Sequence, residues 1–197
     1  MRITKQQLRD AALAAVKIRE YAPVLVSGPG IVRGARLKAT AGPISGKQVA
    51  VRTSQDREVG LLRRDDDRTW RTIPRVRELV VAVPSLTNQE SSIEVLCFDS
   101  KTVIELFDAA VKKAGKRALS YKAPVFMALE DSPKKGSGAL AGGLGAKAKW
   151  REEIPVASIA ANPPDQSDGF IERVKREFAE RNGVDVSKVV VEFRIVA

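Results

Sequence analysis

The stretch Gly46–Arg63 reads GKQVAVRTSQDREVGLLR. Apolar and polar residues alternate on both sides of a polar tetrapeptide, and such alternation is typical of β-strands with one buried face. The pattern predicts a β-hairpin over about Lys47–Arg64. Its arginines, among them Arg52 and Arg57, are candidate contacts for the phosphates of a polyanion.

Similar short runs continue along the chain, separated by Gly, Pro, Asn and Asp, which favour turns. The other predicted strands are Val24–Ser27, Ile31–Thr40, Arg75–Val83, Ser92–Phe98 and Ala123–Leu129. A helix is predicted over about Thr4–Tyr21, where Thr4 and Gln7 form a capping box, and another over about Asp99–Gly115. The expected fold class is therefore α+β, with a mostly antiparallel or mixed central sheet.

The chain is expected to divide into three segments. Residues 1–129 form a helix and sheet core, on which the helix at 99–115 packs. Residues 130–150 carry five glycines and four lysines and are expected to form a flexible loop. Residues 151–197 form a helix and strand unit packed on the same domain. Its helix is predicted over about 167–182, and its strand has the sequence KVVVEFRIVA, which is typical of a strand covered on both faces.

Composition limits the function more firmly than any motif. The 197 residues include 34 Lys and Arg against 24 Asp and Glu, which gives a net charge of +10 and favours association with polyanions. Histidine is absent, so Ser-His and Cys-His catalysis and His-ligated zinc are excluded. The single cysteine, Cys97, predicts a buried thiol in a reducing cytoplasm. No apolar run is long enough for a membrane span, and the first ten residues lack the apolar core of a signal peptide.

The candidate nucleic-acid contacts are basic residues in two regions, an arginine-rich sheet edge and the lysine-rich loop. They are Arg52, Arg57, Arg63, Arg64, Arg68, Arg71, Lys134, Lys135, Lys147 and Lys149. Trp70 lies among these arginines and has two interpretations. It could offer a stacking surface for bases, or it could anchor the edge of the core while the arginines extend outward; we favour the core anchor.

Two motifs that suggest chemistry fail on spacing. The segment GPISGKQ at 42–48 has three residues between its glycines and no Ser or Thr after Lys47, so it is not a phosphate-binding P-loop. The aspartates at 65–67 are consecutive and flanked by arginines, so we interpret them as a solvated hairpin tip and not as a cation site. No catalytic residue, metal ligand or cofactor is predicted.

Three phrases resemble the core of PD-(D/E)xK nucleases, namely QVAVRTSQDREVGLL, WRTIPRVRELVVAVPS and SIEVLCFDSKTVIELF. The resemblance covers about residues 4–116. In that family a strand carries an acidic residue two positions before a lysine, and these positions hold Ala50 and Arg52 here. The preceding strand, IVRGARLKAT, has no aspartate. The resemblance therefore implies a degenerate member that keeps a nucleic-acid-binding scaffold without the carboxylates that hold the catalytic metal.

These observations favour a non-catalytic nucleic-acid-binding protein or accessory subunit, with DNA favoured over RNA. The alternative is a subunit of a larger assembly or a homo-oligomer that docks through the apolar C-terminal strand or the loop at 130–150. An enzyme that uses Lys, Tyr121 or carboxylates is a third possibility, but no spacing points to its site.

Overall fold

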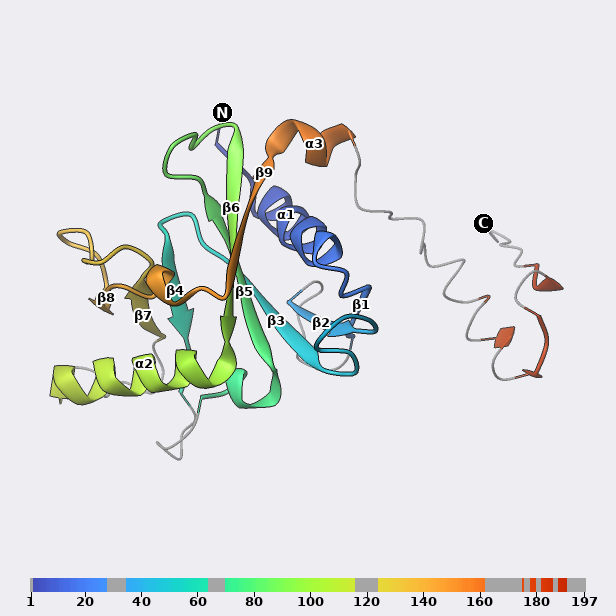
Figure 1. Ribbon diagram of the computed structural model, residues 1–197, viewed down its shortest axis with the longest axis horizontal. Coiled ribbons are helices and arrows are strands. Elements are labelled where there is room, and N and C mark those ends of the chain that lie inside the picture. The colour runs from blue at the N-terminus through green and yellow to red at the C-terminus, as the bar shows by residue number, and fades with distance from the viewer. Residues whose placement is uncertain are drawn as a thin grey trace, which may run out of the picture. The chain divides into compact units, whose positions relative to one another are not determined.

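The computed structural model describes residues 2–27, 35–63, 70–115 and 124–161, together with 175, 178–179, 182–185 and 188–190 (Figure 1). The chain divides into two compact units, Met1–Ala161 and Asn162–Ala197. Most of the predicted C-terminal helix and strand lies outside the described residues, as do Arg64, Arg68 and the three aspartates between them. The fold class is α+β, as predicted.

Helix α1 spans Lys5–Ile18 and begins with the predicted capping box. The backbone N–H of Gln7 donates to the Thr4 hydroxyl (3.1 Å), and the N–H of Thr4 donates to the Gln7 side chain (2.8 Å). Its buried stripe consists of Leu8, Ala11, Ala12, Ala15 and Val16. The small alanines allow α1 to lie close against the main sheet.

The main sheet has six strands in the order β1-β2-β3-β5-β6-β9. Their bounds are β1 Pro23–Leu25, β2 Arg36–Ala39, β3 Gln48–Thr53, β5 Glu78–Pro84, β6 Ser92–Asp99 and β9 Trp150–Pro155. Strands β3 and β5 run parallel, and every other pair in this sheet is antiparallel. Strand β9 was not predicted, although it completes the sheet beside β6.

The second sheet consists of β4 (Glu58–Leu61), β7 (Val125–Ala128) and β8 (Ala139–Ala141), in that order. The predicted hairpin over Lys47–Arg64 is therefore wrong, because β3 and β4 belong to different sheets. Both edges of β3 are already occupied, by β2 and β5, and β4 pairs with β7 instead. Its inward residues Val59 and Leu61 join the core between the two sheets.

Each face of the main sheet has its own core. On one face, α1 packs against Val49, Val80 and Val95. On the other face, Leu79 and Leu96 pack against the second sheet and against helix α2 (Ser100–Ala114). Helix α2 begins at the Asp99 cap and ends at Gly115, as predicted. The two helices consequently lie on different sides of the main sheet (Figure 1).

Residues 130–150, for which we expected a flexible loop, contain β8 and the short 3-10 helix η3 (Gly145–Lys147). Two glycines bring this segment against the chain that follows β7. A Cβ on Gly142 would lie 2.5 Å from the carbonyl oxygen of Glu130, and one on Gly145 would lie 2.6 Å from that of Leu129. Side chains at these positions would therefore push the segment off the core.

Two short helices complete the described elements of the first unit. The 3-10 helix η1 spans Ile73–Arg75 and leads into β5, and helix α3 spans Val156–Ala161 directly after β9. No helix was predicted from the sequence where α3 lies. None of the helices in the described part of the chain has the length and apolar character of a membrane span.

Candidate nucleic-acid interface

A cleft of about 760 Å³ lies between the C-terminal end of β3 and the second sheet. One wall consists of Arg52, Thr53 and the chain leading to β4, and the other includes Gly60 and Phe126. Arg2 and Lys5, at the start of the chain, also line it. The side chain of Gln55 donates to the carbonyl oxygen of Ile3 at 2.7 Å, which holds this basic N-terminal segment at the cleft.

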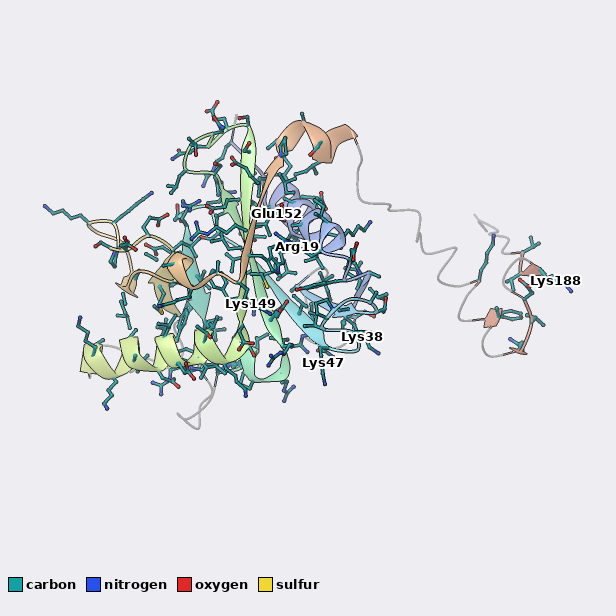
Figure 2. All side chains as sticks on the ribbon, viewed as in Figure 1. Arg19, Lys38, Lys47, Lys149, Glu152 and Lys188 are labelled. Atoms are coloured by element: carbon teal, nitrogen blue, oxygen red, sulfur yellow. The ribbon has the colours of Figure 1, made fainter. Side chains whose placement is uncertain are left out.

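Arg52 also belongs to a basic sheet face, which we define as Arg36, Lys38 and Arg52. Arg36 on β2 pairs with Ala50 on β3, so the two residues lie on the same face of the sheet. Along both strands, the residues of the basic sheet face alternate with residues that pack on α1. The side chains of Arg36, Lys38 and Arg52 therefore lie on the face opposite α1. Lys38 lies at the same end of these strands as Lys47 (Figure 2). Arg52 lies toward the other end of β3 and is the residue of the basic sheet face that also lines the cleft.

The charge of Arg52 is poorly compensated. Burial lowers the pKa of its guanidinium, and the nearby positive charge of Arg36 lowers it further. The guanidinium donates to the carbonyl oxygen of Val51 at 3.0 Å, and no carboxylate among the described residues forms an ion pair with Arg36 or Arg52. Asp56 and Glu58 line the cleft but do not pair with either arginine. An anion bound here would relieve the repulsion between the two guanidinium groups.

Arg57 has a different place from the one expected. Its side chain is only 6% exposed, and its guanidinium donates to Glu130 (2.5 Å), to Glu94 (2.7 Å) and to the carbonyl oxygen of Pro84 (2.6 Å). Arg57 thus connects the second sheet to the main sheet. A guanidinium whose donors are engaged inside the protein is not available to phosphates, so Arg57 is not a nucleic-acid contact in this arrangement.

Lys149 also has an internal partner, because its ammonium group pairs with the carboxylate of Glu78, a fully buried residue on β5. The hydroxyl of Tyr21 donates to the same carboxylate (3.0 Å), and so does the thiol of Cys97 (3.3 Å). Burial and the Glu78 charge raise the pKa of the Cys97 thiol, and the same two causes raise that of Tyr21 to about 12. The raised pKa values favour the neutral phenol of Tyr21 and the neutral thiol of Cys97, which fits a structural role for the cluster.

The side of β9 next to this cluster is covered by α1. The guanidinium of Arg19 lies 5.2 Å from the ring centroid of Trp150 and pairs with Glu152 at 2.5 Å. Figure 2 shows Arg19 and Glu152 close together, and Lys149 lies directly before the first residue of β9. These contacts tie β9 to α1.

Trp70 is the core anchor that we favoured. It is 3% exposed, its indole N–H donates to Asp108 at 3.0 Å, and its ring meets that of Phe107 edge-on at 5.3 Å. The guanidinium of Arg63 lies 5.8 Å from the Trp70 ring centroid, and Arg71 donates to the carbonyl oxygen of Arg63. The Trp70 ring is therefore not available for stacking on a base.

The three remaining lysines, Lys134, Lys135 and Lys147, are exposed, and none of them lines the cleft. The residues that the sequence did not single out are Arg2, Lys5, Arg36 and Lys38. For Arg36 and Lys38 there is a signal in the sequence, since they alternate with Leu37 and Ala39 in a short strand. For Arg2 and Lys5 there is none, because only tertiary packing brings them to the cleft.

The described residues contain no group of three or more acidic or cysteine side chains that could hold a metal ion. Comparison of the chain with protein-family models, with curated proteins and with solved structures gives no match. The arguments for function consequently rest on the geometry and charge of the cleft and of the basic sheet face.

Proposed function

We propose that this protein binds nucleic acid, without cleaving it, through the basic sheet face and the adjoining cleft. The observation that carries the proposal is the pair Arg36 and Arg52, two neighbouring guanidinium groups without a carboxylate partner among the described residues. Phosphate oxygens are the acceptors that guanidinium groups bind best, often through two parallel hydrogen bonds. Lys38, Arg2 and Lys5 extend the positive surface on either side of Arg52.

The residues at the cleft also favour binding over cleavage. In the resemblance to PD-(D/E)xK nucleases, Ala50 and Arg52 occupy the positions of the acidic residue and the lysine of the motif. Ala50 is fully buried and offers no oxygen ligand, so a hard cation would lack the carboxylate that activates water in such enzymes. Such a protein would use the site only to bind a nucleic-acid strand, as an accessory subunit does. We favour DNA over RNA as the partner.

The test compares two double variants that remove the same charge. Arg36→Ala with Arg52→Ala should lower the affinity for a fluorescein-labelled DNA by about tenfold or more, measured by anisotropy at low salt. It should also reduce the slope of log affinity against log salt by about 2, one for each lost phosphate contact. Lys112→Ala with Lys113→Ala, on the exposed last turn of α2, is the matched control.

The proposal fails if the wild-type protein binds neither DNA nor RNA at low salt. It also fails if the two double variants weaken binding equally, since the effect would then reflect net charge and not the basic sheet face.

The alternative is assembly with other copies of the chain, and one observation favours it. Strand β1 is an edge of the main sheet, and its Val24 and Leu25 are 52% and 47% exposed. At the end of the other edge strand, β9, Pro155 has no N–H, and its carbonyl oxygen accepts from Ser158. Sedimentation over a wide concentration range tests this alternative, which predicts a concentration-dependent oligomer that Val24→Lys disrupts.

A further inference from the structure

Strand β4 is one edge of the second sheet and borders the cleft. The aromatic ring of Phe126 lies across β4 at Gly60. Phe126 is on β7, directly opposite Gly60 on β4. A Cβ on Gly60 would lie 2.7 Å from Cε1 of Phe126 and 3.3 Å from its Cζ. The ring therefore occupies the space that a side chain at position 60 would fill, and it reaches over β4 to line the cleft.

The neighbouring strand leaves room on the other side of the ring. A Cβ on Gly138, just before β8, would lie 3.9 Å from Cδ2 of Phe126. Val125 and Met127, which flank Phe126 on β7, point into the core, so Phe126 stands on the opposite, outer face of the second sheet. The ring is partly exposed there, between two positions without side chains.

Phe126 lines the same cleft as Arg52, which has no carboxylate partner among the described residues. Proteins that bind single-stranded nucleic acids combine such an aromatic ring with positive charge for the phosphates. The bases of a single strand stack on the ring, whereas the bases of a duplex already stack on one another and have no free face. The cleft of about 760 Å³ is within the range of sites that enclose a small ligand, so it can admit one nucleotide.

We infer that the cleft takes an unpaired base of a single-stranded nucleic acid, stacked on Phe126, while Arg52 contacts the adjoining phosphate. This inference rests on the proposed function and adds to it a preference for single strands. It assigns Gly60 the role of making room for the ring. It predicts little dependence on base identity, because every base offers a π-face to an aromatic side chain.

The experiment uses three labelled ligands of equal length: a single-stranded DNA, its duplex, and an abasic strand that keeps the phosphates and lacks the bases. The wild-type protein should bind the single strand at least about fivefold more tightly than the abasic strand. Phe126→Leu should remove this difference and leave the affinity for the abasic strand unchanged. Phe126→Tyr, which keeps the aromatic face, should restore it.

Leu86→Ala serves as the matched control, since Leu86 is an exposed apolar residue outside the cleft, at 56% exposure. It should leave all three affinities unchanged. Urea unfolding of each variant verifies that Phe126→Leu remains folded under the binding conditions.

Three results would overturn the inference. One is equal binding of the single strand and the abasic strand by the wild-type protein, which would leave the proposed function standing. Another is an equal loss of affinity for all three ligands in Phe126→Leu, since this would indicate a structural role for the ring. If the wild-type protein binds none of the ligands, the proposed function and the inference fall together.

Discussion

Replacing Arg57 by Ala should destabilise the protein strongly and leave its affinity for nucleic acid unchanged. The guanidinium of Arg57 donates to Glu94, Glu130 and the carbonyl oxygen of Pro84, and its removal leaves Glu130 without this partner. Arg52→Ala should have the opposite pattern, with weak binding and nearly normal stability, because Arg52 lines the cleft and lacks a carboxylate partner among the described residues.

The size of the loss follows from the burial of the three side chains. Removing one partner of a fully buried ion pair costs about 3 to 5 kcal/mol. Glu94 and Glu130 keep 16% and 26% exposure, and Glu94 retains Arg151 at 3.2 Å. The expected loss is therefore near the lower limit, about 3 kcal/mol.

The backbone of Arg57 provides a second, independent test. Its φ of +59° is in the left-handed region, where a residue with a Cβ is less stable than glycine by about 1 to 2 kcal/mol. Arg57→Gly should consequently be about 1 kcal/mol more stable than Arg57→Ala, although it removes the same side chain. In an ordinary strand position the order of the two variants would be reversed.

Urea unfolding followed by tryptophan fluorescence measures these differences, because Trp70 and Trp150 both pack within the first unit. With an m-value of about 2 kcal/mol/M, Arg57→Ala should lower the midpoint by about 1.5 M. Arg77→Ala is the control, since Arg77 is 46% exposed and lies 3.4 Å from Asp99; it should cost less than about 1 kcal/mol. A loss in Arg57→Ala no larger than in this control, or a less stable Arg57→Gly, would refute the reasoning.

Three further perturbations test other parts of the structure. Lys149→Met should lower the free energy of unfolding by about 3 kcal/mol, because it leaves the buried Glu78 carboxylate without its cation. Adding Glu78→Gln should recover part of this loss, as measured by urea unfolding. Equal stability of Lys149→Met and the wild-type protein would contradict this. Tyr21, with its pKa raised from 10.0 to about 12, should ionise in the native protein two units above an ordinary tyrosine when absorbance at 295 nm is followed. Since the raised pKa favours the neutral phenol in the folded state, its contribution to stability is complete below pH 10 and disappears as the pH rises to about 12. Gly142→Ala should cost about 1 to 3 kcal/mol, because its Cβ would lie 2.5 Å from the Glu130 carbonyl oxygen. A midpoint equal to that of Gly138→Ala, where the Cβ would lie 3.9 Å from the nearest atom of Phe126, would show that the contact at Gly142 relaxes freely.

Local patterns predicted the elements well and their partners poorly. The capping box of Thr4 and Gln7 and the Asp99 cap fixed the starts of α1 and α2, because capping depends on residues three positions apart or fewer. The pairing of β3 depends on β5, which follows it after a connection that includes β4 in another sheet. Alternation within Gly46–Arg63 carries no information about such a partner, so a hairpin was the natural but incorrect interpretation.

The candidate contacts show the same limit. Arg52 and Arg57 are five residues apart in one stretch and carry the same side chain, yet one borders the cleft and the other is enclosed. The difference arises from Glu94 and Glu130, which are 37 and 73 positions away from Arg57 in the sequence. Strand β9 was missed for a related reason, because its three consecutive charged residues, Arg151, Glu152 and Glu153, suit an exposed edge and replace the apolar run of a central strand.

The ion pair between Glu78 and Lys149 also affects how the chain can fold during synthesis. The two residues are 71 positions apart, so a ribosome adding about 5 to 20 residues per second makes Lys149 roughly 4 to 14 s after Glu78. Until then, closing the core around β5 would bury a carboxylate without its cation, at a cost of several kcal/mol. The nascent chain should therefore remain open and accessible to chaperones until β9 emerges, and fragments that end before Lys149 should be substrates for proteases.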